Sequence, residues 1–199
     1  MVCYHPLDAW RTSSGDVRLS YNPKFCDSPH PNLKLPCSQC VGCRLDRSRK
    51  WAIRCMHEAK MHDNNCFITL TYDDSKLPER PVGVLPANIS LYYEDFQLFM
   101  KRLRKHFHPQ VIRFYMAGEY GENFGRPHFH SCLFGIDFPD RELFSRTPSG
   151  SLIYRSKILE SLWPHGYSSV GNFYFKSAAY VARYVMKKIT GDPAGDIIS

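Results

Sequence analysis

The stretch RPHFHSCLF, residues 126–134, places two histidines one residue apart in a short apolar run of the kind that forms a strand. Side chains at positions i and i+2 of a strand point to the same face of the sheet. His128 and His130 should therefore lie side by side, while Phe129 points to the opposite face. Such a pair of imidazoles indicates either a metal site or two solvent-facing histidines on a half-buried strand.

A partner for this strand lies just before it in the chain. Residues 111–118 (VIRFYMAG) are also strand-like, and GENFGRP at 121–127 carries two glycines and a proline. The two runs therefore predict an antiparallel hairpin with a long turn. Residues that flank the turn of a hairpin face one another, so Glu119 should converge with His128 and its neighbouring histidine. Glu122, inside the turn, is the competing carboxylate.

Two imidazoles and a carboxylate form a three-ligand set that leaves coordination positions open for water or substrate. Mixed nitrogen and oxygen ligation favours Mn²⁺ or Mg²⁺ acting as a Lewis acid on phosphate oxygens, and it does not exclude Zn²⁺. The hairpin therefore predicts a catalytic metal site at Glu119, His128 and His130.

The rest of the chain alternates helical and strand patterns around this hairpin. Helices are expected at 44–60, 93–107, 157–163 and 176–189, and further strands at 66–72 and 167–175. Residues 1–36 should be irregular, and 73–88 and 137–150 should be loops. The order predicts an α+β fold, a central and mainly antiparallel sheet with flanking helices. We expect a cysteine-containing N-terminal segment at 1–43 and a main domain at 44–199, together effectively one globular domain.

Composition narrows the class of protein. The chain has 199 residues, 43% of them hydrophobic, which suits one soluble globular core. A net charge of +7 favours an acidic partner such as nucleic acid. No apolar run approaches the roughly 20 residues that cross a bilayer, and the first residues lack the apolar core of a signal peptide. A cytoplasmic protein without a membrane partner is expected.

The last expected helix contains two tyrosines on one side. With Tyr180 as the zero of a helical wheel, Tyr184 falls at about 40° and Lys187 at about 340°. The aliphatic side chains take the opposite side, so the tyrosines are not needed as core. They are either catalytic phenols or an ordinary aromatic pair beside the core. An ammonium near a phenol favours the phenolate, which Lys187 is placed to do.

The sequence CSQCVGC at 37–43 contains two overlapping C-x-x-C pairs, a zinc signal. Cys37, Cys40 and Cys43 would need a fourth ligand. The candidates are Cys3, Cys26, His5 and His30. A structural Zn²⁺ that ties the N-terminus to the first helix is the simplest hypothesis, with an iron–sulfur cluster or plain thiols as alternatives. Cys55, Cys66 and Cys132 lie in regular elements and should be core residues.

Positive charge gathers on two of the expected helices and beside the histidine pair. Such charge runs are often only a solvated face, but beside a nucleic-acid site they contact phosphates. The candidates for DNA contact are Arg47, Lys50, Arg54, Arg126 and Lys188.

These motifs together resemble the HUH endonuclease superfamily. His128-Phe129-His130 matches its histidine–hydrophobe–histidine motif, and Tyr180 to Lys187 (YVARYVMK) is similar to the two-tyrosine motif of rolling-circle replication initiators. Five segments are similar, in order, to the initiators of gokushovirus-type microviruses, small single-stranded DNA phages: CSQCVGCRLDRSRKWAIRCMHEA, FITLTYDD, YEDFQLFMKRLRKH, GEYGENFGRPHFH and WPHGYSSVG. Members of that family are usually longer than this chain.

The resemblance implies an enzyme that nicks and rejoins single-stranded origin DNA through a covalent 5′-phosphotyrosine. It assigns residues 44–199 as the endonuclease domain, with a sheet related to RRM or ferredoxin-like folds. It implies His128, His130 and Glu119 as metal ligands, Tyr180 and Tyr184 as nucleophiles, and Lys187, or else Lys188, as the assisting lysine. The implied partners are the origin DNA and the host replication machinery, in the cytoplasm of the bacterial host.

Two other functions fit parts of the sequence. A zinc-stabilised single-stranded nucleic-acid binder without catalysis would explain the charge, the aromatic residues and the cysteines, but not why H-x-H and Y-x-x-x-Y-x-x-K occur together. A metal-dependent nuclease that uses water would make the histidines catalytic and the tyrosines structural.

Overall fold

The structure of the protein is a computed structural model that describes residues 3–77, 91–121 and 126–189, without the side chains of residues 187–189. The chain divides into two compact units, residues 1–49 and 50–199. The expectation that the chain behaves as effectively one globular domain stays a prediction.

The first unit contains a small antiparallel sheet with the strand order β2-β1-β3. Its strands are β1 (Leu7–Arg11), β2 (Val17–Arg18) and β3 (Leu33–Leu35), and helix α1 (Val41–Ala59) begins in this unit. The sequence analysis treated residues 1–36 as irregular and missed these strands. They are too short to show an alternating pattern, and within them only Ala9 is buried.

The second unit is built on a six-stranded sheet with the order β5-β6-β4-β9-β8-β7, in which each neighbouring pair is antiparallel. Its strands are β4 (Asn65–Tyr72), β5 (Arg113–Tyr120), β6 (Pro127–Phe134), β7 (Glu142–Arg146), β8 (Leu152–Arg155) and β9 (Gly166–Asn172). Its helices are α2 (Tyr93–His106), α3 (Lys157–Leu162) and α4 (Phe175–Ile189), and a 3₁₀ turn, η1, covers Asp74–Lys76. This arrangement confirms the predicted α+β class with a central antiparallel sheet.

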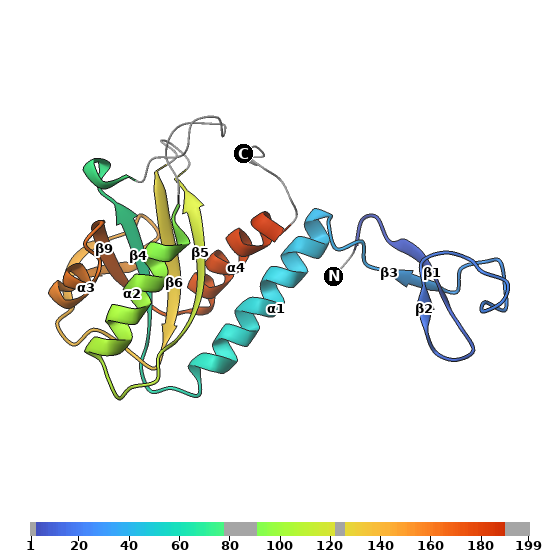
Figure 1. Cartoon of the computed structure of the whole chain (residues 1–199), viewed down its shortest axis with the longest axis horizontal. Coiled ribbons are helices and arrows are strands. Elements are labelled where there is room, and N and C mark those ends of the chain that lie inside the picture. Colours follow the sequence, from blue (N-terminus) through green and yellow to red (C-terminus); the bar gives the residue numbers. More distant parts are fainter. Residues whose placement is uncertain (1–2, 78–90, 122–125, 190–199) are drawn as a thin grey trace. The chain divides into compact units, whose positions relative to one another are not determined.

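One face of the sheet packs against α2 and α3, and Figure 1 shows α2 lying across the central strands. Alternate residues of β4 and β6 supply this face, among them Leu70, Phe129 and Leu133. The helices add the fully buried Phe96 and Leu159. Because neighbouring residues of a strand point to opposite faces, Phe129 enters this core and turns the histidines beside it away from it, as predicted.

The opposite face packs against α4 and the later part of α1. Its core is smaller and includes Cys55 of α1, Cys132 of β6 and Val181 of α4. Cys55, Cys66 and Cys132 are all buried core residues, as the sequence predicted. This face also carries the histidines of β6, because positions 128, 130 and 132 of one strand share a side.

The predicted helices and strands are present to within a few residues of their expected ends. One prediction was wrong: residues 137–150, expected as a loop, contain β7. Four of the five residues of β7 are exposed, so the strand lacks the apolar alternation that identifies strands in a sequence. The loop expected at 73–88 falls largely outside the described residues. Among the described helices, none combines the length and apolar character needed to cross a membrane.

Candidate active site

The register of β5 against β6 brings a carboxylate and two imidazoles to one end of the hairpin. Glu119 is paired directly with His128, and Ala117 is paired with His130. The small Ala117 side chain leaves the space beside it to the longer side chains of its neighbours. Both histidines also lie next to β4, where Thr69 is the partner of His130 and Thr71 that of His128. Sheet pairing alone therefore places the three predicted metal-ligating residues together.

One oxygen of Glu119 is the centre of the site. Its Oε1 lies 2.5 Å from His128 Nε2 and 2.9 Å from His130 Nε2, and it accepts a hydrogen bond of 2.8 Å from the phenol of Tyr180. Glu119 and His130 are buried, with 7% and 8% of their surface exposed. A carboxylate is stable at that depth only when it is hydrogen-bonded or paired, and these three groups provide for it.

The outer nitrogens of both imidazoles are held by other groups. His128 donates from Nδ1 to the carbonyl oxygen of Arg126 at 2.9 Å. His130 Nδ1 is hydrogen-bonded to the hydroxyl of Thr69 at 2.9 Å, and its ring stacks on Phe67. Contacts of this kind fix the orientation of a metal-ligating histidine and leave Nε2 for the metal. The inner nitrogens therefore point at the same place as the carboxylate.

The ionisation of these groups suits metal binding. Burial alone would raise the pKa of Glu119, but the hydrogen bonds from His128 and His130 outweigh it and lower that pKa to about 2. Burial lowers the pKa of His130 in spite of the nearby carboxylate. At His128 burial is outweighed by the bond to Glu119, and the pKa is raised. A carboxylate anion and a neutral imidazole are the forms that bind metal ions.

The residues present fit a divalent cation. The ligand atoms of Glu119, His128 and His130 all lie within 4.8 Å of one another. The second carboxylate oxygen, Oε2 of Glu119, is buried and has no hydrogen-bond partner among the described residues. An unsatisfied buried oxygen beside two convergent imidazoles is what a cation would complete.

Helix α4 brings the two tyrosines of the sequence motif to this cluster. The Tyr180 ring meets the His130 ring edge-on at 5.0 Å between centroids, and the Tyr184 ring lies 4.9 Å from that of Tyr180. Both tyrosines are half-buried, and Tyr184 also packs against the smaller core. Burial, together with the hydrogen bonds to Tyr184 and Glu119, raises the pKa of Tyr180 well above its ordinary value.

Several predicted residues lie elsewhere or outside the description. Glu122 falls outside the described residues, as do the side chains of Lys187 and Lys188, although both lysines belong to α4. Of the DNA-contact candidates, Arg126 pairs with Asp74 at 2.7 Å. Arg54 and Lys50 are exposed on α1, where the guanidinium of Arg54 covers the Trp51 ring, and Arg47 is half-buried.

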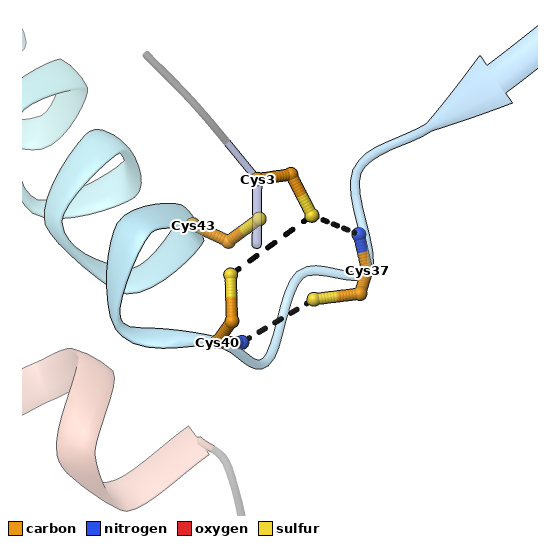
Figure 2. Close-up of side chains that lie close together, drawn as sticks. All are labelled: Cys3, Cys37, Cys40 and Cys43. Atoms are coloured by element: carbon orange, nitrogen blue, oxygen red, sulfur yellow. Dashed lines mark hydrogen bonds between the residues drawn. The ribbon is translucent and has the colours of Figure 1, made fainter. Parts of the chain in front are cut away.

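The cysteines of the C-x-x-C pairs form a second convergent group in the first unit. The structure brings Cys3, of the four candidates, to Cys37, Cys40 and Cys43, and all four sulfur atoms lie within 4.8 Å of one another. Figure 2 shows the four side chains pointing toward a common centre. Cys26, another candidate for the fourth position, is buried and is not part of the group.

Sequence reasoning missed Thr69. FITLTY was identified only as a strand, and nothing in it distinguishes Thr69 from Thr71 until the pairing of β4 with β6 is known. The signal that could have found it is the alternation of β4, which puts both threonines on the face opposite Ile68 and Leu70.

The fold and the site define an α+β protein whose sheet carries a metal-ligating cluster beside two tyrosines. The chain belongs to the family of the replication-associated protein ORF2, whose model matches residues 65–189. That segment contains the β5–β6 hairpin and α4. The resemblance to replication proteins of small phages is thereby confirmed.

Three curated phage proteins are similar to most of the chain. Replication-associated protein VP4 of Bdellovibrio phage phiMH2K is 34% identical over 95% of this chain and 59% of its own length. Replication-associated protein ORF2 of Spiroplasma virus 4 is 35% identical over 95% of this chain and 62% of its own. Replication-associated protein ORF4 of Chlamydia phage 1 is 35% identical over 91% and 46%. The chain thus spans about half to three fifths of these relatives. No solved structure matches it.

Proposed function

We propose that the protein initiates rolling-circle replication by nicking and rejoining single-stranded DNA at a replication origin through a covalent 5′-phosphotyrosine intermediate. One observation supports this most: the Tyr180 hydroxyl lies 2.8 Å from the Glu119 oxygen on which both imidazoles of the hairpin also converge. A nucleophile, a carboxylate and two imidazoles within one shell are what metal-assisted phosphoryl transfer needs.

Glu119, His128 and His130 would hold the divalent cation, Mn²⁺ or Mg²⁺. When bound, it would polarise the non-bridging oxygens of the scissile phosphate and offset the charge that develops there. The protein's own part is to hold the three ligands on paired strands, with the outer nitrogens of both imidazoles already engaged. Little of the binding energy is then spent on ordering the site.

Tyr180 is the nucleophile that we assign to the first cleavage, because its phenol contacts the cluster directly. Its oxygen attacks phosphorus and forms the phosphotyrosine bond. The bond from phosphorus to the 3′ oxygen breaks, and that oxygen takes up a proton and leaves as a 3′ hydroxyl. Because burial and its neighbours raise the pKa of Tyr180, the phenol is protonated near neutral pH and loses its proton as attack proceeds.

Tyr184 would act in the second cleavage. Its ring lies next to that of Tyr180, one helical turn along α4. It would cut the regenerated origin, while the freed 3′ hydroxyl attacks the first phosphotyrosine and closes a circle. Lys187, a further three residues along the helix, would stabilise a phenolate through its ammonium group.

The proposal also specifies partners. Single-stranded origin DNA is the substrate, and the net charge of +7 favours its binding. Arg47, Lys50, Arg54, Arg126 and Lys188 are proposed contacts to its phosphates. The freed 3′ hydroxyl would prime the replication machinery of the host, which implies the cytoplasm of a bacterial cell. The three phage relatives, each described as replication-associated, support this setting.

Covalent capture tests the proposal. The protein is incubated with Mn²⁺ and a pool of single-stranded oligonucleotides labelled at the 3′ end, and the products are separated under denaturing conditions. The label should migrate with the protein, because the fragment that keeps the 5′ phosphate is joined to tyrosine. A matched pool labelled at the 5′ end should give only shortened free DNA. Sequencing of the captured fragments then gives the cleavage site.

Tyrosine variants identify the nucleophile. Tyr180→Phe together with Tyr184→Phe should abolish the adduct while DNA binding persists, and Tyr184→Phe alone should retain the first adduct. Tyr174→Phe, an exposed tyrosine just before α4, is the matched control. An adduct that persists in the double variant contradicts the assignment. Cleavage without any adduct identifies a nuclease that uses water, and binding without cleavage identifies a binding protein.

A further inference from the structure

We propose that Cys3, Cys37, Cys40 and Cys43 form a four-thiolate zinc site that folds residues 1–49. This site is separate from the proposed nicking chemistry, and its ligands lie outside the segment that the family model matches. The inference rests on the convergence of the sulfur atoms, on the backbone around them and on the small core of this unit.

The sulfur atoms have the spacing of a tetrahedral site. A Zn–S bond of about 2.3 Å places the sulfurs of a regular tetrahedron about 3.8 Å apart. Cys3 Sγ and Cys40 Sγ are 3.9 Å apart, and all four sulfurs lie within 4.8 Å of one another. Four thiols are a complete ligand set for zinc, and a structural site is closed in this way.

Backbone amides point at the sulfurs. The N–H of Cys37 donates to Cys3 Sγ at 3.2 Å, that of Cys40 to Cys37 Sγ at 3.3 Å, and that of Tyr4 to Cys40 Sγ at 3.5 Å. Figure 2 shows the first two of these bonds. Each such donor stabilises negative charge on sulfur, so the backbone is arranged for thiolates.

The loop between Cys37 and Cys40 has an unusual backbone. Ser38 has a φ of 65°, in the left-handed region that residues other than glycine rarely adopt. Such a conformation persists where the surroundings require it, and here it lets the Cys40 amide reach back to Cys37. The carbonyl of Cys40 accepts the first hydrogen bond of α1, from the amide of Arg44, so the partial positive charge of that helix end also faces the thiols.

The unit lacks another source of stability. Among the described residues 3–49, the buried hydrophobic side chains are only Ala9 and Cys26. The large hydrophobic side chains that stay exposed are Tyr4, Leu7, Val17, Leu19, Tyr21, Phe25, Val41 and Leu45. A chain segment of this size without an apolar core needs a disulfide or a metal. All eight cysteines lie in the described part of the chain and form no disulfide, so a metal is the remaining means of holding it.

Zinc also explains which parts of the unit are tied together. Cys3 precedes β1, Cys37 and Cys40 follow β3, and Cys43 lies in the first turn of α1. Cys3 and Cys37 are 34 residues apart in the chain. Fixing both to one ion closes the loop that contains all three strands of the small sheet, and closure of a long loop removes much of the entropy of the unfolded chain.

Metal analysis of the full chain tests the site. The protein is made with His128→Ala and His130→Ala, so that the other cluster cannot retain zinc, and is purified under reducing conditions. We expect about one zinc ion per chain by mass spectrometry of the metal. Cys40→Ser should lose it, whereas Cys26→Ala, a cysteine of the same unit outside the cluster, should keep it. Cys40→His should also retain it, because three thiolates and an imidazole are a stable zinc set.

Cobalt supplies the second readout. Replacement of zinc by Co²⁺ should give the visible absorption of a tetrahedral ion and the charge-transfer band of thiolate ligands, and both should shift in Cys40→His. Zinc retained by Cys40→Ser, or lost equally from Cys26→Ala, overturns the proposal. Iron with acid-labile sulfide, or a protein mass lower by two hydrogens for each pair of cysteines, also overturns it in favour of a cluster or disulfides.

Discussion

The two metal-ligating clusters of this protein are positioned in opposite ways. Glu119, His128 and His130 are placed by the pairing of long strands over a core that contains many fully buried side chains. The four cysteines lie in loops and at a helix start, in a unit with almost no core. The first site exists because the sheet has folded. The second holds together a segment that could not otherwise fold.

The contrast explains what each metal is expected to do. In the sheet, each fully buried aliphatic or aromatic side chain contributes about 1.5–3 kcal/mol, so the ligands stay in place without help from a cation. Open coordination positions can then be used for substrate. In the first unit all four positions would be taken by protein, which gives stability and leaves none for chemistry.

Removal of zinc gives the largest effect that this comparison predicts. With a strong chelator, the amides of residues 3–49 should lose protection from hydrogen exchange by at least about 100-fold, because their unit loses the tie that holds it. The amides of β4 and β6 should keep their protection, because their core is unaffected. Exchange measured by mass spectrometry of peptides resolves the two units.

The reciprocal variant is the control for that experiment. His128→Ala with His130→Ala should leave the protection of residues 3–49 unchanged. The comparison fails if chelation leaves this protection intact once zinc loss is verified, or if β4 and β6 lose theirs as well.

A smaller effect is expected at the carboxylate. Glu119→Gln keeps the shape of the side chain but removes its charge, so the rate of adduct formation should fall by about 100-fold or more. The melting temperature of the main unit should change by less than about 4 °C, because Glu119 is not part of either hydrophobic core. Single-turnover assays and thermal denaturation measure the two quantities.

Glu142→Gln, at an exposed glutamate of β7, is the matched variant and should leave both quantities unchanged. If Glu119→Gln instead unfolds the protein, the carboxylate has a structural role and the contrast between the clusters is lost.

The smallest effect concerns the group that orients His130. Thr69→Val removes the hydroxyl bonded to Nδ1 at similar volume. The Mn²⁺ concentration for half-maximal adduct formation should rise by about 10-fold, while the rate at saturating Mn²⁺ is nearly kept. Thr71→Val, on the same face of β4, should leave this concentration unchanged. An equal shift for both variants would mean that the effect belongs to the strand and not to the hydrogen bond.

The sequence was sufficient for those parts of the site that depend on local geometry. Strand alternation and the turn predicted that Glu119 would face His128, and the helical wheel predicted that Tyr180 and Tyr184 share a side. It could not show that β4 lies beside β6, so the role of Thr69 was missed. Nor could it choose Cys3 from four candidates, because contacts between distant residues follow from tertiary packing and not from local pattern.

The strand β6 has a consequence for how this protein can change over generations. Its odd and even positions serve different purposes: Phe129 and Leu133 anchor the larger core, while His128 and His130 face the site. Deleting one residue within it would exchange these roles for every position beyond the deletion. Buried imidazoles and exposed phenylalanines would follow together. The phage lineage can therefore accept substitutions along β6 far more readily than any change in its length.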